Sequence, residues 1–220
     1  MLRALALLTL LAAPLPALAQ GAAPTMPTPP LQTPGQAAPT PGAGPAPAAT
    51  PSPAARAAEA RRTELDRAFA ALKDAPDAAG AALVEGRIRQ LWAQAVTPSV
   101  ALLLRRGVRN MEANQAEDAL EDFDAAITLG PEVAEAWHLR AQAQARLGEA
   151  TAAARDLQEA LRLEPRNWGA LLTLAGLQQQ QGNEAGALRS LDAALAIHPK
   201  LPGGAERRRE LRRKVEGDAT

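Results

Sequence analysis

The second half of the chain carries a set of residues that recur every 34 positions. Pro131, Pro165 and Pro199 are spaced by this period, and further positions keep the same phase. Those positions are Leu103/Trp137/Leu171, Gly107/Ala141/Ala175, Asn114/Gly148/Gly182, Ala119/Ala153/Ala187, Phe123/Leu157/Leu191 and Ala126/Ala160/Ala194. A fixed period of this kind predicts structural units that stack, each contacting only its neighbours.

Each phased position has a residue type that suits a pair of packed helices. Gly or Ala at the small positions lets the two helices approach closely, while Leu, Trp or Phe fills the space between neighbouring pairs. The Asn or Gly in the middle of the period suits the left-handed residue that ends many helices. Proline ends the second helix because it lacks an N–H and disfavours helix in the preceding residue. Each period therefore predicts a helix, a turn and a second helix.

This pattern resembles the tetratricopeptide repeat family over residues 100–201. Residues 99–201 then hold three repeats, 100–133, 134–167 and 168–201. The family's usual aromatic residue in the middle of the first helix is replaced by Asn110, Gln144 and Gln178, so we expect weaker packing there. Aromatic residues make up only 2% of the chain, which also disfavours strands. We predict an all-α fold, an α-solenoid of three tetratricopeptide helix hairpins preceded by a helical hairpin and followed by a capping helix.

The segments on either side of the repeats also predict helices. Residues 54–98 predict a helical hairpin that lacks the phased small residues. Its first helix places Leu65, Phe69 and Leu72 on one face, and the second is expected to share an apolar face made by Leu83, Ile88, Leu91, Trp92 and Val96. Residues 203–216 predict a capping helix that keeps the end of the array soluble, with a short apolar stripe made by Leu211 and Val215.

Residues 1–19 are typical of a cleaved signal peptide, because Arg3 precedes an apolar run that ends in small residues before Gln20. A membrane anchor would need roughly 20 unbroken apolar residues, whereas this run is shorter and contains Pro14 and Pro16. Residues 20–53, rich in Pro and Ala, predict a disordered leader, either a spacer or a segment without a length requirement. We expect a periplasmic protein whose mature form has no integral membrane segment. The whole layout resembles exported tetratricopeptide proteins of Gram-negative bacteria.

Residues with catalytic or metal-binding chemistry are few. The chain has no Cys, and neither His138 nor His198 lies in a catalytic or metal-ligand motif. We therefore expect no enzyme activity, no metal site and no cofactor. The Arg-rich run at 207–214 contains Glu and lacks aromatic residues for base stacking, so we expect no nucleic-acid partner. A solvated cap is favoured for this run, with contact to an acidic partner or a lipid headgroup as the alternative. The Asp and Glu residues interleaved with Arg are interpreted as surface ion pairs.

The groove lined by the first helices of the stacked pairs is the expected binding site, because such surfaces usually take an extended peptide or a helix. Its predicted residues are Arg105, Val108 and Met111 in the first repeat, His138, Gln142 and Arg146 in the second, and Thr173, Gly176 and Gln179 in the third. Some members of the family hold a carboxylate there with Lys, Asn and Arg. The corresponding positions here are not cationic, which argues against that clamp: Leu104, Val108, Leu139, Gly169 and Thr173.

Two functions are consistent with these features. The favoured one is an exported protein–protein interaction scaffold that binds a peptide or protein partner in the groove of its repeats. The alternative is a structural or oligomeric spacer of the cell envelope that acts through its Pro-rich arm. The sequence leaves open the identity of the partner and the oligomeric state.

Overall fold

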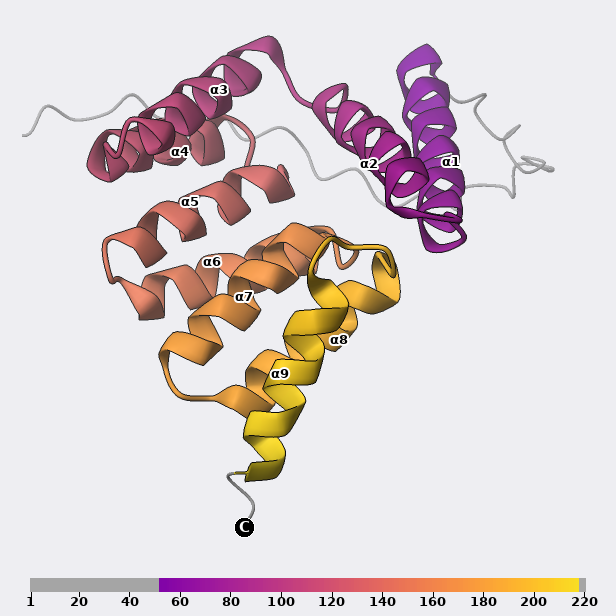
Figure 1. Ribbon diagram of the computed structural model, residues 1–220. Helices are drawn as coiled ribbons and strands as arrows, with labels where there is room; N and C mark the ends of the chain where they lie inside the picture. Colours follow the sequence, from indigo (N-terminus) through magenta and orange to yellow (C-terminus); the bar gives the residue numbers. More distant parts are fainter. Residues whose placement is uncertain (1–51, 218–220) are drawn as a thin grey trace, which may run out of the picture. The chain divides into compact units, whose positions relative to one another are not determined.

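A computed structural model describes residues 52–217, which fall within one compact unit. The signal peptide predicted at 1–19 and all but the end of the leader predicted at 20–53 lie outside the described residues. Between 52 and 217 the chain forms nine α-helices and no strand, which confirms the all-α prediction (Figure 1). The helices are α1 (Pro53–Lys73), α2 (Ala78–Ala93), α3 (Pro98–Glu112), α4 (Ala116–Leu129), α5 (Ala134–Arg146), α6 (Ala150–Leu163), α7 (Trp168–Gln180), α8 (Glu184–Ile197) and α9 (Gly204–Gly217).

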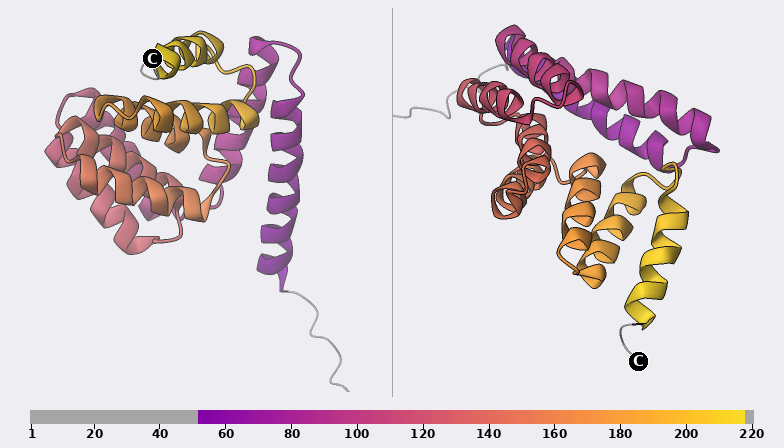
Figure 2. Two further views of the ribbon diagram at one scale, coloured as in Figure 1. Left: turned by 90° about the horizontal axis from the view of Figure 1, so that it is seen from below. Right: turned by 60° about the vertical axis from the view of Figure 1, so that its left-hand side comes forward.

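Six of these helices form three pairs, α3–α4, α5–α6 and α7–α8, which we call repeats 1, 2 and 3. Each pair packs on the next through α4 against α5 and through α6 against α7, and α9 packs on α8 (Figures 1 and 2). Leu211 of α9 is fully buried in a cluster with Ala175, Ala187 and Leu191 of repeat 3. The predicted solenoid with a capping helix is therefore confirmed.

The turn inside each repeat has the backbone conformation that the sequence predicts. Asn114, Gly148 and Gly182 have φ angles of 58°, 79° and 71°. The next residue in each repeat donates its N–H to a carbonyl five residues back at 2.8 Å, for example from Gln115 to Asn110. This bond satisfies a carbonyl at the helix end, and the left-handed residue makes it geometrically accessible.

The phased small residues allow the close helix contact expected of them. A Cβ atom added to Gly107 of α3 would lie 2.4 Å from Cε1 of Phe123 on α4. Phe123 is fully buried and clusters with Ala119 of its own repeat and Ala143 of the next. The large residue on the second helix thus fills the space between two repeats, and the glycine opposite provides the room.

The hairpin α1–α2 precedes repeat 1 in sequence but packs on repeat 3. Phe69 of α1 and Ile88 of α2 share one hydrophobic cluster with Trp168 of α7 and Ala194 of α8. Helix α1 also contacts α8 directly. The apolar faces predicted for the two helices are therefore covered by a part of the chain that is distant in sequence. Asp66 and Arg166, which are in contact, are separated by 100 residues.

Aromatic and charged side chains hold this junction together. Trp92 stacks on Trp168 with ring centroids 5.5 Å apart, and Phe69 meets both rings at 6.0 and 6.1 Å. Arg166 Nη1 donates to Asp66 Oδ1 at 2.6 Å, and its guanidinium lies 4.2 Å from the centroid of the Phe69 ring. Three of the five aromatic residues of the chain are used here, which marks the junction as a principal packing site.

One predicted member of the apolar face of α2 is wrong. Leu83 is 79% exposed, whereas Ile88 and Leu91 are buried. Helical spacing explains the difference, because the five positions between Leu83 and Ile88 turn Leu83 about 140° away from Ile88 around the helix.

Candidate partner-binding groove

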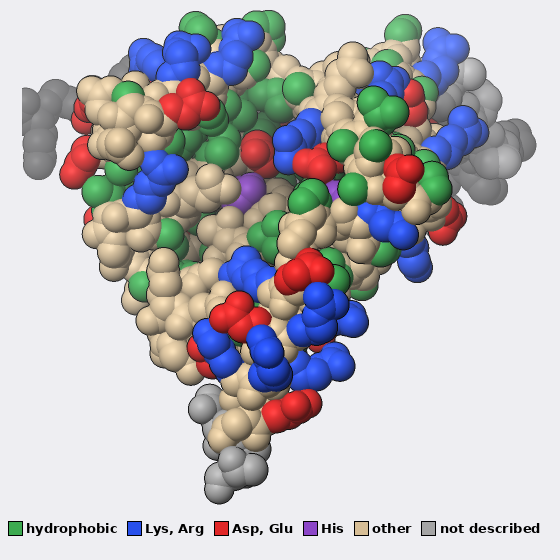
Figure 3. Space-filling model, in the orientation of Figure 1, with side chains coloured by type: hydrophobic (Ala, Val, Ile, Leu, Met, Phe, Trp, Pro, Cys, Tyr) green, Lys and Arg blue, Asp and Glu red, His purple; other side chains and the backbone are tan. Residues whose placement is uncertain are grey.

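A shallow hollow of about 340 Å³ lies between the first helices of repeats 1 and 2. Its apolar part is made by Leu104 and Val108 of α3 and Leu139 of α5, all half-buried. Charged side chains complete the lining: Arg105, Arg109, Glu112 and Glu135. Figure 3 shows a hollowed surface with hydrophobic side chains beside α3 and α5. An apolar floor with charges of both signs at the rim suits a peptide side chain flanked by polar groups.

The structure places two of the predicted groove residues of repeat 1, Arg105 and Val108, in this hollow. The third, Met111, differs from the prediction because it is only 7% exposed. It packs in a cluster with Ala116, Phe123 and Ala143, in the core between repeats 1 and 2. Periodicity alone places Met111 one helical turn from Val108, but α5 covers it.

Three predicted residues of repeats 2 and 3 form a hydrogen-bonded cluster. His138 Nε2 lies 2.8 Å from Gln142 Nε2 and 3.1 Å from Thr173 Oγ1. His138 Nδ1 lies 3.4 Å from Glu135 Oε2, and the ring is buried, at 6% exposure. A Cβ atom at Gly169 would lie 2.8 Å from His138 Cε1, so this glycine gives the imidazole its space. His138 therefore joins α5 to α7, and little of its ring faces a ligand.

The remaining predicted residues take part in contacts between helices. Arg146 of α5 donates from Nη1 to the Met111 carbonyl at 2.6 Å, which ties repeat 2 to repeat 1. Gln179 of α7 accepts from Arg207 Nη2 at 2.6 Å, which ties repeat 3 to α9, and Gly176 lies beside the same guanidinium. Of the predicted set, only Arg105 and Val108 line the hollow, next to Leu104 and Leu139.

Two carboxylates predicted to lie on the surface are buried inside repeats. Asp122 of α4 accepts from Arg106 and from Asn110 Nδ2, the latter at 2.9 Å. Asp156 of α6 accepts from Arg140 Nε at 2.6 Å and Nη2 at 2.8 Å. The bond to Asp156 raises the pKa of Arg140, although burial of the guanidinium opposes the shift. Both arginines precede their aspartate by 16 residues, a phased signal that the sequence contains and that the prediction missed.

Hydrogen bonds between the two helices of a repeat also involve polar residues that stand at the position of the family's usual aromatic residue. Asn110 bonds Asp122 within repeat 1, and in repeat 3 Ser190 Oγ donates to Gln178 Oε1 at 2.7 Å. In repeat 2, Gln144 is buried and its Oε1 has no hydrogen-bond partner among the described residues. In repeats 1 and 3, polar bonds between the paired helices thus stand where an aromatic ring would pack.

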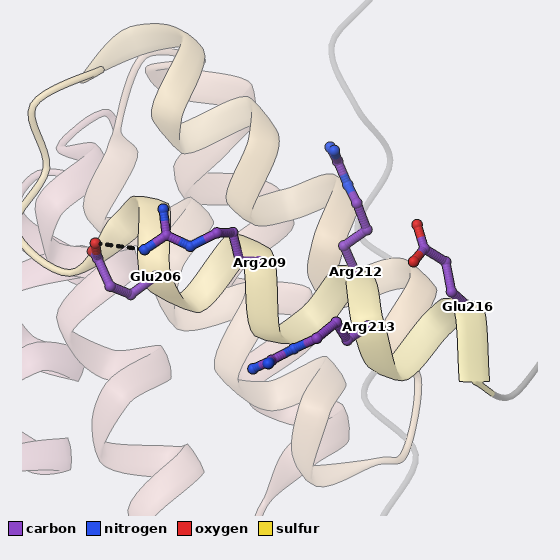
Figure 4. A pocket seen from close by; sticks show the side chains of 5 residues that line it. All are labelled: Glu206, Arg209, Arg212, Arg213 and Glu216. Atoms are coloured by element: carbon purple, nitrogen blue, oxygen red, sulfur yellow. Dashed lines mark hydrogen bonds and ion pairs between the residues drawn. The ribbon is translucent and has the colours of Figure 1, made fainter.

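Part of the basic run near the carboxyl end, comprising Arg209, Arg212 and Arg213, lies on the exposed side of α9. A surface depression there is lined by Glu206, Arg209, Arg212, Arg213 and Glu216, all from this one helix (Figure 4). Arg209 Nη2 donates to Glu206 Oε1 at 3.0 Å. Because all its lining residues come from a single helix, the depression is a space between surface side chains and is not a pocket between elements.

Other classes of site have no counterpart in residues 52–217. No group of three or more His, Cys, Asp or Glu side chains there is placed to hold a metal ion. None of the helices in that range combines the length and apolar character needed to cross a bilayer.

Paired helices that stack in register, with a left-handed residue at each internal turn, define a helical-repeat fold. Residues 145–202 match the family model described as a tetratricopeptide repeat. No curated protein matches the sequence significantly.

Solved tetratricopeptide domains share the fold at low sequence identity. The Sgt2 domain from Aspergillus fumigatus superimposes with a TM-score of 0.53 and 19% identity over 56% of this chain and 83% of that one. The first domain of Spaghetti (RPAP3), bound to an HSP90 peptide, superimposes with a TM-score of 0.52 and 16% identity. The match covers 55% of this chain and 97% of that one. The TPR2B domain of yeast Sti1, in a complex with pHsp70, superimposes with a TM-score of 0.50 and 23% identity. The match covers 56% of this chain and 99% of that one.

Proposed function

We propose that the protein is an exported interaction scaffold that binds a peptide or protein segment in the hollow between α3 and α5, and is not an enzyme. The observation that carries this proposal is the apolar floor made by Leu104, Val108 and Leu139, left half-buried on the side where the first helices of the repeats meet. Two structures of the same fold contain a bound peptide or a partner complex, which supports binding as the function of this fold.

The chemistry of the hollow favours a partner with one large apolar side chain beside charged groups. Arg105 and Arg109 have no ion-pair partner among the described residues, so an acidic group of the partner would find two available guanidinium groups. Glu112 of α3 and Glu135 of α5 also line the hollow and would repel a second acidic group placed near them. A single carboxylate next to an apolar anchor therefore fits better than an acidic run.

Binding can be tested with peptides selected by display on the purified protein and then measured by calorimetry. We expect Val108→Glu and Leu139→Glu to weaken the selected peptides at least about 10-fold, because a carboxylate would have to be desolvated against the apolar anchor. Leu83→Glu is the matched control, since Leu83 is exposed on α2, outside the hollow. Equal affinity for all four proteins would contradict binding in the hollow.

Export to the periplasm is part of the same proposal and has its own test. Mass spectrometry of the protein from a fractionated Gram-negative cell should find a periplasmic form that begins at Gln20. A protein that keeps Met1 and stays in the cytoplasm would contradict it. The alternative role as an envelope spacer stays a prediction, because most of its Pro-rich arm lies outside the described residues.

A further inference from the structure

The side of each repeat that faces the preceding repeat is covered in repeats 2 and 3. In repeat 2, Ala136 and Ala143 of α5 are fully buried against α3 and α4. In repeat 3, the positions 34 residues further on, Ala170 and Leu177, are buried as well, in a cluster with residues of repeat 2. Burial at these positions is thus a repeated feature of the stack.

In repeat 1 the same side has no covering element within residues 52–217. The positions equivalent to Ala136 and Ala143 are Leu102 and Arg109, and Leu102 is 55% exposed. The hairpin α1–α2 comes before repeat 1 in sequence, yet it packs on α7 and α8 of repeat 3. An exposed leucine therefore lies where the other repeats bury an alanine.

Residues of α4 extend this uncovered surface. The ion pair between Arg106 and Asp122 joins the two helices on this side. Leu102 and Arg109 are helical neighbours of Arg106 at i−4 and i+3, and Asp118 is a neighbour of Asp122 at i−4. Leu129, 59% exposed, follows Asp122 by two turns. We call this surface the outer face of repeat 1; it comprises Leu102, Arg105 and Arg109 of α3 with Asp118, Glu121 and Leu129 of α4.

The outer face is divided by charge. Its α3 half contributes Arg105 and Arg109, which also border the hollow between α3 and α5. Both are exposed and form no ion pair among the described residues, and Figure 3 shows basic side chains gathered over α3. Its α4 half contributes Asp118 and Glu121, which are also exposed and unpaired within that range. Each half carries one of the two exposed leucines. The face is therefore complementary to itself.

We propose that the outer face of repeat 1 binds the same face of a second copy of this chain, forming a symmetric dimer. A twofold axis parallel to the helices would place α3 of one subunit against α4 of the other, antiparallel and at the same height. Leu102 then meets Leu129 of the partner subunit, and Arg109 approaches Asp118 and Glu121 of the partner subunit. The contact removes two exposed leucines of each subunit from water.

The first test is the molar mass of the purified full chain, measured by light scattering and sedimentation equilibrium over a range of concentrations. We expect a monomer–dimer equilibrium. Leu102→Glu or Leu129→Glu should raise its dissociation constant by at least about 10-fold, whereas Leu83→Glu, at the third exposed leucine, should leave it unchanged. A monomer at every concentration overturns the proposal, and so does equal weakening by Leu83→Glu, which would place any contact elsewhere.

A charge exchange tests the pairing of the two halves. The double variants Arg105→Glu/Arg109→Glu and Asp118→Arg/Glu121→Arg should each be monomeric alone, because like charges would face each other across the axis. Mixed together, they should form a heterodimer, since each acidic half then meets a basic one. Circular dichroism of each double variant checks that its helices are retained. Added salt should weaken the wild-type dimer, because the ion pairs at the rim are screened. Failure of the mixture to associate overturns the proposed pairing.

Discussion

At the scale of single residues, the repeats depend on a small side chain facing a large one. Gly107 has no spare room, since an added Cβ would lie 2.4 Å from Phe123. Gly86 of α2 is different, because nothing lies within 4 Å of the corresponding position. We therefore expect substitution by alanine to have opposite effects on stability at these two glycines.

We expect Gly107→Ala to lower the free energy of unfolding by about 1–3 kcal/mol, because the buried Phe123 ring has to shift. Gly86→Ala should raise it by about 0.5–1 kcal/mol, the usual gain in helix propensity. Chemical denaturation followed by circular dichroism measures both. If both substitutions stabilise the protein, the contact between Gly107 and Phe123 is not as close as described here.

Asp122 offers a second prediction at this scale. It is 1% exposed and accepts from both Arg106 and Asn110, so Asp122→Ala leaves the Asn110 amide without its partner. A loss of about 1–3 kcal/mol in unfolding free energy is expected. Glu117→Ala, on the exposed side of the same helix, should change it by less than about 0.5 kcal/mol. Similar losses would show that Asp122 acts as a surface residue, as the sequence analysis assumed.

At the scale of elements, the hairpin α1–α2 depends on its contact with repeat 3. Trp92 is the ring of α2 that stacks on Trp168 of α7. Trp92→Ala should therefore speed amide hydrogen exchange throughout α1 and α2 while α3 and α4 stay protected, because the hairpin loses its docking contact. Trp137→Ala, in the packing between repeats 1 and 2, is the control and should leave exchange in α1 and α2 unchanged. Protection of the hairpin in both variants would contradict this packing.

The elements also show what the sequence could and could not predict. The 34-residue phase predicts the three repeats and their left-handed turns, because each unit packs on its neighbour in the same way. It carries no information on where α1–α2 docks, since that contact joins Asp66 to Arg166 and occurs once. Among the groove residues, helical spacing correctly predicted that Arg105 and Val108 line the hollow. The burial of Met111 and His138 depends on how closely α5 and α7 approach, which spacing alone does not give.

At the scale of the whole molecule, three kinds of surface follow from one stack of helices. The first helices of repeats 1 and 2 form the hollow floored by Leu104, Val108 and Leu139. The hairpin covers part of repeat 3, and the outer face of repeat 1 is uncovered within the described residues. The proposed scaffold role rests on the hollow, and the proposed dimer rests on the outer face. Arg105 and Arg109 border both surfaces, so Val108 and Leu139 test the hollow alone, and Leu102 and Leu129 test the outer face alone.

The central claim is that the hollow holds a partner, and site-specific photo-crosslinking in the producing cell tests it most directly. A photoreactive phenylalanine analogue would replace Val108 in one strain and Leu83 in another, and adducts would be identified by mass spectrometry. We predict that the Val108 position captures a segment of a different protein and that the exposed Leu83 position does not. Capture of the same proteins from both positions, or none from Val108, would contradict binding in the hollow.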